Sequence, residues 1–274
     1  MVLLDLLAKK PGLELVVAHF NHGIRPEAGR DEELVRVAAS RLELRFEAGY
    51  GRLGKGASEA LAREARYRFL ETVQQKHRAH SIVTAHHQDD MLETAILNLL
   101  RGTGYRGLVA ISANKRILRP LLSYTKEEIL AYAGKHDLEW HEDSTNLDDA
   151  YLRNYVRLKL LPRLAAPERK ELICNIDKVA EIEKSLNHQI AKLSQDINEH
   201  SVIDRRKFTS LPIELSNELL VYWLRSLTHS EFDRKTVNRI NMALRTAKAG
   251  TSQPVRDDLK LVFKRRAAQF TNSL

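Results

Sequence analysis

The stretch that decides the fold runs Thr84-Ala85-His86-His87-Gln88-Asp89-Asp90-Met91-Leu92-Glu93-Thr94. It directly follows the short run Ser81-Ile82-Val83, and it opens a helical pattern of apolar residues. Two imidazoles and three carboxylates therefore lie at a predicted junction between a strand and a helix. Ligands of open α/β sheets bind beyond the carboxyl ends of the strands, and carboxylates are depleted in cores unless they are paired. The pattern thus predicts a polar cluster that faces a cleft.

The first part of the chain alternates predicted strands with predicted helices. Apolar or alternating runs predict strands over 13–20, 44–47 and 81–85, the first of them buried. Helical spacing predicts helices from about Asp31, after Ser58-Glu59, behind the His/Asp cluster, and after residue 125. This alternation is typical of α/β proteins with a parallel, doubly wound sheet.

Local signals place several helix ends. Asp89 or Asp90 is expected to be the N-cap of the helix behind the cluster, and Arg101-Gly102 is expected to end it. The run Thr125-Lys126-Glu127-Glu128 is a capping box that opens the next helix.

The character of the sequence changes near Pro167. A long helical pattern without a strand runs from Leu172 to Ile197, and two shorter helical patterns cover 219–227 and 237–244. We therefore expect an α/β domain over 1–167 and a smaller, mostly helical domain over 168–274.

Composition bounds the class of protein. The 274 residues are 43% hydrophobic and 29% charged, which is ordinary for a globular protein, and no apolar stretch approaches the roughly 20 residues of a membrane span. Cys174 is the single cysteine, so an internal disulfide or a zinc site with several thiolates is excluded. The cytoplasm is the expected compartment, with no membrane partner.

Positive charge is segregated along the chain. Lysines and arginines number 44 against 36 acids, a formal charge of +8, and no acid occurs over 94–126 or 151–167. Such segregation indicates either a phosphate-rich partner or simply a basic surface. Three tyrosines among these cations could stack on bases or riboses: Tyr105, Tyr151 and Tyr155.

The acidic cluster admits several chemistries. Asp90 and Glu93 are spaced i, i+3, and Asp89 and Glu93 i, i+4, so either pair lies on one helix face. They could bind a cationic group such as a substrate ammonium, or a divalent metal together with His86 or His87, or they could only cap the helix. One of the two histidines is expected to be structural.

Three further motifs have a functional and a structural interpretation. Arg101-Gly102-Thr103-Gly104 could wrap an anion or merely stop a helix. Arg63 and Arg66 share a helix face that could meet phosphates or only solvent. Glu142-Asp143-Ser144-Thr145-Asn146 could be part of a site or an ordinary polar loop.

Taken together, these segments resemble the tRNA(Ile)-lysidine synthetase family of the PP-loop ATP-pyrophosphatase superfamily. The motifs agree with the family in order and spacing over roughly residues 1–165: Ala18-His19-Phe20-Asn21-His22-Gly23-Ile24-Arg25, Ala57-Ser58-Glu59-Ala60, Ala62-Arg63-Glu64-Ala65-Arg66-Tyr67, Thr84 to Asp90 with Glu93-Thr94, Arg101 to Gly104, Arg119-Pro120-Leu121-Leu122, and Glu142 to Asn146 with Arg153-Asn154.

The resemblance implies an adenine nucleotide alpha-hydrolase-like fold and an ATP-dependent ligase. Such an enzyme joins L-lysine to C2 of the wobble cytidine in tRNA(Ile) with a CAU anticodon. ATP adenylates the C2 oxygen and releases pyrophosphate, and the lysine amino group then displaces AMP to leave lysidine. The implied cofactors are ATP and Mg²⁺, and the implied partners are the tRNA, lysine and ATP. A homodimer is also expected, because family members are commonly dimeric.

The resemblance also implies roles for individual residues. Arg66 would contact the nucleotide phosphate or the reacting centre, and Asp90 and Glu93 would hold lysine. The implied catalytic residues are Arg66, His86 and Asp90. The implied nucleotide-binding residues are His19, Asn21, Arg66, Arg101, Gly102 and Gly104. The implied tRNA-binding residues are Arg101, Arg106, Arg119, Arg153, Asn154 and Arg157, and the second domain is implied to bind tRNA. No residue is assigned to a metal.

One family motif is missing from the sequence. The phosphate loop Ser-Gly-Gly-x-Asp-Ser does not occur, and Met1 to Leu7 resembles the helix that follows this loop in the family. We expect the first strand, the loop and its aspartate to lie upstream of Met1 or to be absent. Because glycine N–H groups at a helix start cradle pyrophosphate, their absence would abolish ATP use.

Three other functions compete with the ligase. A PP-loop thiolase that uses an iron–sulfur cluster needs more cysteines than Cys174. A metal phosphoesterase would need carboxylates beyond the His/Asp cluster, and only Asp31 and Asp143 are candidates. A catalytically inactive tRNA-binding fragment would keep the basic surface but turn over no ATP.

Overall fold

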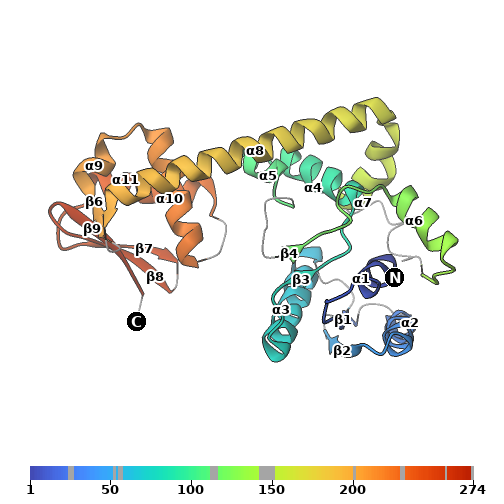
Figure 1. Cartoon of the computed structure of the whole chain (residues 1–274). Coiled ribbons are helices and arrows are strands. Elements are labelled where there is room, and N and C mark those ends of the chain that lie inside the picture. The colour runs from blue at the N-terminus through green and yellow to red at the C-terminus, as the bar shows by residue number, and fades with distance from the viewer. Residues whose placement is uncertain are drawn as a thin grey trace. The chain divides into compact units, whose positions relative to one another are not determined.

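The computed structural model of the chain describes residues 1–23, 28–51, 54, 58–111, 117–141, 152–199, 202–228, 232–256 and 258–272. These residues form two compact units, Met1–Ala180 and Glu181–Leu274, each of which is described by itself (Figure 1). The domain boundary expected near residue 167 falls at the start of helix α8 (Ala166–Ile197), and it stays a prediction.

The first unit alternates strands with helices, as the sequence predicts. Its elements before α8 are α1 (Val2–Ala8), β1 (Val16–Asn21), α2 (Ala28–Arg41), β2 (Arg45–Tyr50), α3 (Glu59–His77), β3 (Ile82–Val83), α4 (Gln88–Leu100), α5 (Gly104–Leu108), β4 (Ile117–Leu118), α6 (Lys126–Lys135), α7 (Leu152–Tyr155), a π-helical turn (Val156–Leu160) and a 3₁₀ turn (Leu161–Arg163).

The strands of this unit pair in parallel, which confirms the predicted class of sheet. β1 pairs with β2 in the register Val16↔Arg45 to Asn21↔Tyr50, and β3 pairs with β4. In the described residues these are two separate two-stranded sheets. The strand predicted over 13–20 begins only at Val16, and its residues are half-buried rather than buried.

Side-chain caps start two of the helices, and the second of these caps was predicted. The Ser58 Oγ accepts the Leu61 N–H at 3.2 Å before α3. Thr125 and Glu128 form the predicted capping box of α6, with hydrogen bonds of 2.8 and 3.1 Å.

The expected N-cap of α4 is wrong. His87 is the N-cap, and Asp90 caps from the third helical position by accepting the His87 backbone N–H at 2.9 Å. An Asp at the N-cap and an Asp at the third helical position can each accept a backbone N–H that has no partner within the helix. The helix, however, begins before the acidic residues. Gly102, at φ +69°, directly follows α4, as predicted for a helix stop.

The buried core of the first unit lies around α4 rather than on the short strands. The apolar face of α4 packs with the turns after α7 and the first part of α8. The fully buried members are Met91, Leu92, Ala95, Leu97, Val109, Ile111, Val156, Leu161 and Ile176. The start of α4 is therefore anchored by its own buried face, which fixes the position of the acidic cluster.

The second unit contains helices and an antiparallel sheet. After the end of α8 come β5 (Asn198–Glu199), β6 (Val202–Asp204), α9 (Arg205–Ser210), α10 (Ile213–Thr228), α11 (Arg234–Thr246), β7 (Ser252–Arg256), β8 (Leu259–Phe263) and β9 (Ala267–Asn272). The strand order is β5-β6-β9-β8-β7, and all described pairs are antiparallel.

The helices of this unit confirm the sequence prediction, but the sheet was not predicted. β5 and β6 are very short, and β7 contains Pro254, which cannot donate a ladder hydrogen bond. β8 alternates buried and half-buried residues over Leu259–Phe263, which is the period-2 pattern of a strand with one covered face.

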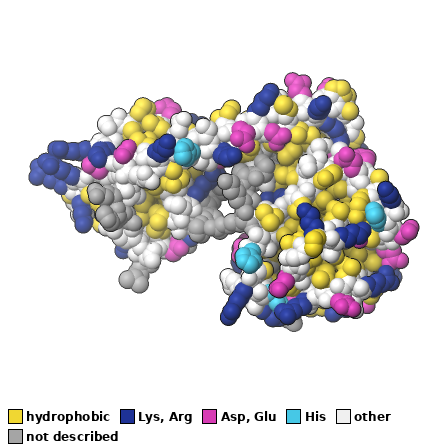
Figure 2. Space-filling model, viewed as in Figure 1, with side chains coloured by type: hydrophobic (Ala, Val, Ile, Leu, Met, Phe, Trp, Pro, Cys, Tyr) yellow, Lys and Arg dark blue, Asp and Glu magenta, His cyan; other side chains and the backbone are white. Residues whose placement is uncertain are grey.

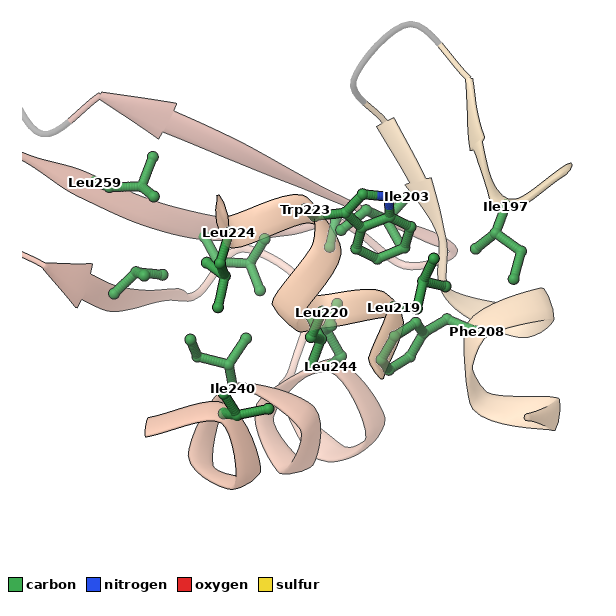
Figure 3. Close-up of a cluster of buried hydrophobic side chains, with 14 of the residues drawn as sticks. Ile197, Ile203, Phe208, Leu219, Leu220, Trp223, Leu224, Ile240, Leu244 and Leu259 are labelled. Carbon is green, nitrogen blue, oxygen red and sulfur yellow. The ribbon is translucent and has the colours of Figure 1, made fainter. Parts of the chain in front are cut away.

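The core of the second unit fills the space between α10, α11 and the sheet (Figure 3). Trp223 lies near the centre of this core and donates its indole N–H to Ser194 Oγ at 2.7 Å. The labelled core residues in Figure 3 include Phe208, Leu219, Leu220, Leu224, Ile240, Leu244 and Leu259.

Some predicted features lie outside the described residues: the loop Glu142 to Asn146, Tyr151, Lys115, Arg116, Ile24 and Arg25. Of the helices that are described, none combines the length and apolar character needed to cross a membrane.

Candidate active site

The polar cluster lies where the sequence predicts it, between β3 and α4. The Thr84 N–H donates to the Leu118 carbonyl at 2.9 Å, and the Gln88 N–H donates to the Tyr124 carbonyl at 2.9 Å. These bonds tie both ends of the connection to neighbouring backbone. The Thr84 hydroxyl lies 2.8 Å from Nδ1 of His86, which fixes the imidazole beyond the carboxyl end of β3.

Glu93 is completely buried and is bonded to two arginines. The Arg157 guanidinium binds both carboxylate oxygens, with Nε 2.5 Å from Oε1 and Nη2 2.9 Å from Oε2. Arg153 Nε lies 3.2 Å from Oε2, and Nη1 of the same arginine bonds Glu59, on α3. A buried carboxylate is stable only when it is paired and hydrogen-bonded, so these arginines stabilise Glu93 in its buried position.

The other two acids of the cluster are also paired. Asp90 Oδ1 lies 3.4 Å from Arg157 Nη2, and its second oxygen caps α4 and lies 3.6 Å from Nε2 of His87. Asp89 lies 3.1 Å from Arg169, at the start of α8. His87 thus acts in helix capping, which fits the expectation that one of the two histidines is structural.

Pairing with acidic side chains raises the pKa values of Arg153 and Arg157. Burial lowers the pKa of Arg157, but the hydrogen bonds and charge of Glu93 outweigh burial and leave the pKa raised. Burial likewise lowers the pKa of Arg153, and Glu59 and Glu93 together reverse the shift. Both guanidiniums therefore stay charged inside the site.

The imidazole of His86 is close to the acid Asp90 and to a second group of cations. Burial lowers its pKa to about 4; Asp90 opposes the shift, and the charges of Arg119, Arg63 and Arg66 add to it. His86 is therefore neutral at pH 7 and can accept a proton or a hydrogen bond.

The pKa shift of His86 predicts an acid-sensitive stability. The unfolded chain binds a proton at this histidine near pH 6.5 and the folded chain only near pH 4, so the free energy of unfolding should fall as pH drops between these values. His86→Gln should flatten this part of the stability curve, measured by urea unfolding at pH 7 and pH 5. The matched control is His80→Gln, since His80 is exposed. An unchanged slope in His86→Gln would contradict the assigned shift.

Arg66 is half-buried without a carboxylate partner among the residues that the structure describes. Burial lowers its pKa, Tyr67 opposes the shift, and the nearby charges of Arg63 and Arg153 add to it. A guanidinium in such surroundings favours an incoming anion, and the phosphate contact expected for Arg66 from the sequence stays a prediction.

His19 and Asn21 lie on β1 and contact other groups. Burial lowers the pKa of His19, while the charges of Glu32 and Asp31 oppose the shift. Asn21 Oδ1 accepts the Gly23 N–H at 2.9 Å at the end of the strand. Both residues lie on a parallel strand near its carboxyl end, and their nucleotide contacts stay a prediction.

The Arg101–Gly104 segment is an exposed turn between α4 and α5. Arg101 is exposed at the C-cap of α4, and both Gly102 and Gly104 have φ of +69°, a conformation that favours glycine. Arg106 follows on α5 and lies over the Tyr105 ring at 4.9 Å. The nucleotide and tRNA contacts expected for these residues stay predictions.

The remaining predicted tRNA contacts have partners within the protein. Arg119 donates to the Ile111 carbonyl at 2.7 Å, and Arg153 and Arg157 bind Glu93. Asn154 lies half-buried on α7. Their contacts with tRNA stay predictions.

The pairing of the acidic cluster with these arginines was not predicted from the sequence. Arg153 and Arg157 are spaced i, i+4, the spacing that puts two side chains on one helix face. This spacing could have suggested a pair of cations that face the same partner. They could not have singled out these two arginines among the many in the chain.

The described residues do not form a metal centre. No group of three or more His, Cys, Asp or Glu side chains in the described ranges could hold a metal ion. The nearest candidates, Asp89, Asp90 and Glu93, are occupied by arginines. The expected Mg²⁺ therefore finds no ligand set in this part of the chain.

The parallel strands define an α/β domain, with a cluster of polar residues beyond the carboxyl end of β3. The family of PP-loop ATP-binding domains matches residues 1–164, so the chain belongs to this family. The expected fold class is thereby confirmed, and ATP is the nucleotide that the family supports.

Curated relatives share one name. The chain is 41% identical over 169 residues to a tRNA(Ile)-lysidine synthase of Thermus thermophilus, covering 60% of this chain and 33% of the relative. It is 35% identical over 209 residues to the tRNA(Ile)-lysidine synthase of Bacteroides thetaiotaomicron, covering 72% and 46%. It is 34% identical over 247 residues to that of Burkholderia mallei, covering 82% and 50%. The chain thus spans about a third to a half of the length of these relatives.

A solved structure shares the fold. The U34-tRNA thiolase of Methanococcus maripaludis, solved with its [4Fe-4S] cluster, superposes with a TM-score of 0.54 at 14% identity, covering 66% of this chain and 68% of that one. This likeness supports the PP-loop fold alone.

Proposed function

We propose that this chain catalyses the ATP-dependent joining of L-lysine to C2 of the wobble cytidine in tRNA(Ile) with a CAU anticodon, in the cytoplasm. The cytidine O2 would attack ATP, giving an adenylated tRNA and pyrophosphate. The lysine amino group would then form the new C2–N bond and release AMP. The names of the curated relatives support this reaction.

One observation carries the proposal: His86 is close to both cationic and acidic side chains. The charges of Arg119, Arg63 and Arg66 lower the pKa of its imidazole, and the charge of Asp90 opposes this shift. The reaction needs both kinds of side chain, because ATP is a polyanion and lysine is a cation. Preorganised charges of this kind stabilise charge that develops in a transition state.

The residues take the roles that the resemblance implies. Arg66 would contact the transferred phosphate, neutral His86 would line the nucleotide and anticodon pocket, and Asp90 and Glu93 would hold lysine. Because Arg157 occupies both carboxylates, a lysine ammonium would have to share Asp90 with this arginine or displace it.

The test is a two-readout assay with ATP, radiolabelled lysine and a transcript of tRNA(Ile) with a CAU anticodon. We expect pyrophosphate release together with lysine incorporation, and neither with a transcript that carries uridine at the wobble position. Pyrophosphate release without lysine incorporation would contradict the proposed reaction.

The second candidate is a catalytically inactive tRNA-binding fragment, favoured by the absence of a Ser-Gly-Gly-x-Asp-Ser motif from the sequence. It predicts tRNA binding without pyrophosphate release in the same assay. If activity appears only when this motif is added ahead of Met1, the second candidate is favoured for the 274-residue chain.

A basic surface supports the predicted tRNA binding by the second unit. Figure 2 shows Lys and Arg side chains gathered at the end of this unit that carries α9 and β9. At this end, Arg205 donates hydrogen bonds to the backbone carbonyls of Ala247 and Lys264, at 2.9 and 3.2 Å. The exposed cations there, which we call the basic end, are Arg206, Lys207, Lys248, Lys264, Arg265 and Arg266.

Neutralising the basic end should weaken tRNA binding. Serine at Lys264, Arg265 and Arg266 should reduce tRNA affinity by about tenfold or more at low salt, because fewer counterions are released on binding. The slope of log affinity against log salt should fall by about one for each phosphate that the variant no longer binds. The control is Lys184→Ser, since the exposed Lys184 lies beside Glu181. Equal affinities for the triple variant and wild type would refute a role for this surface.

A further inference from the structure

We propose that Tyr67 is a positioning residue whose ring holds the guanidiniums of Arg63 and Arg66 in place as a binding site for phosphate groups. The proposal rests on the proposed function, in which those phosphates belong to ATP.

The Tyr67 ring is flanked by both arginines. All three residues lie on α3, and the ring centroid is 4.8 Å from Cζ of Arg63 and 5.4 Å from Cζ of Arg66. Both distances are within the range of about 6 Å over which the negative face of an aromatic ring attracts a cation. The ring thus attracts two positive groups that would otherwise repel each other.

The other arginines of the site are held differently. Arg153 and Arg157 are fixed by Glu93, and Arg169 is fixed by Asp89. Within the described ranges, Arg63 and Arg66 have no such carboxylate, and the contacts with Tyr67 are the ones that orient them. A cation held by a ring rather than by an acid keeps its full charge for a ligand.

The surroundings of the pair favour an anion. Arg66 is buried enough to lower its pKa, and the neighbouring charges of Arg63 and Arg153 act in the same direction. The positive charge is therefore concentrated and poorly hydrated. A multiply charged phosphate chain would relieve this repulsion and could accept hydrogen bonds from two forked guanidiniums.

The experiment measures the affinity of the chain for inorganic tripolyphosphate by calorimetry in three variants. Tyr67→Leu removes the ring and should weaken binding by about tenfold, whereas Tyr67→Phe keeps the ring and should stay within about twofold of wild type. The matched control is Phe69→Leu, an aromatic residue on the same helix whose ring packs on Phe20 at 5.5 Å. This control should lower the melting temperature and leave tripolyphosphate affinity unchanged.

A kinetic readout separates positioning from folding. In the tRNA assay, Tyr67→Leu should raise KM for ATP more than it lowers kcat, and Tyr67→Phe should restore both. The proposal is overturned if Tyr67→Phe binds tripolyphosphate as weakly as Tyr67→Leu, if Tyr67→Leu binds like wild type, or if wild type does not bind it. Failure of the proposed function has a different signature: tripolyphosphate binds as expected, but wild type incorporates no lysine.

Discussion

Arg66→Ala is expected to slow tRNA-dependent release of pyrophosphate by about 100- to 1,000-fold, the usual effect of removing one preorganised charge from a transition state. The guanidinium is half-buried on α3 without a carboxylate partner among the described residues, so in the proposed function its charge is available to the phosphate chain of ATP. The measurement is a single-turnover assay of pyrophosphate release at saturating tRNA.

Two variants sharpen this prediction. Arg66→Lys should restore only part of the rate, because an ammonium cannot reproduce the forked donor geometry of a guanidinium. Arg68→Ala is the matched control, since Arg68 is exposed on the same helix and bonds Glu64 at 2.7 Å. Arg66→Ala should not lower the free energy of unfolding, because it removes a buried cation that costs desolvation energy. Loss of activity through unfolding would contradict this explanation.

Glu93→Ala is expected to lower the free energy of unfolding by about 3–5 kcal/mol, the usual cost of removing one partner from a buried ion pair. Its side chain has no exposed surface and binds both Arg153 and Arg157. Without it, two partly buried guanidiniums face each other, and the methylene groups of the side chain leave a cavity. Chemical denaturation at pH 7 gives the measurement.

Asp90→Ala separates the stability of the cluster from lysine recognition. This variant keeps the bonds between Glu93 and the arginines and loses mainly the cap of α4, which costs about 1 kcal/mol. We expect it to raise KM for lysine while adenylation, measured by pyrophosphate release, is partly retained. Equal loss of both half-reactions in Asp90→Ala would contradict the role of Asp90 in lysine binding.

The pairing of Asp90 and Glu93 with Arg157 bears on how lysine would bind. A preformed cation site would leave Asp90 and Glu93 open, but Arg157 bonds both of them. An arriving ammonium therefore competes with a guanidinium of the protein itself. Arg157→Ala tests this competition: lysine affinity should rise if Arg157 only blocks the acids, and fall if it holds them in place for the ligand.

Much of the first unit could be predicted from local sequence. The capping box at Thr125 and the glycine stop after Arg101 act within one helical turn, so neighbouring residues are enough to locate them. The acidic start of α4 was predicted for the same reason, but its N-cap was not. His87 takes that position because Asp90 can cap from the third residue of the helix as well as from its start.

Other features depended on distant residues. Arg153 and Arg157 lie about sixty positions after Glu93, and the sequence offers many arginines that could pair with it. The sheet of the second unit was also missed: β5 and β6 are too short to give a sequence signal, β7 contains Pro254, and the alternation of β8 was overlooked.

The sequence by itself determined the alternation of strands and helices from β1 to α4, the acidic start of α4 and the arginine pair on α3, because these depend on spacing within a few residues. Only the tertiary structure decided that Glu93 is buried against Arg153 and Arg157, that His86 is close to charges of both signs, and that the Tyr67 ring lies against both arginines of that pair. The physical reason is that burial and charge pairing are set by whichever side chains the fold brings together, and Coulomb interactions become strong only where water is excluded.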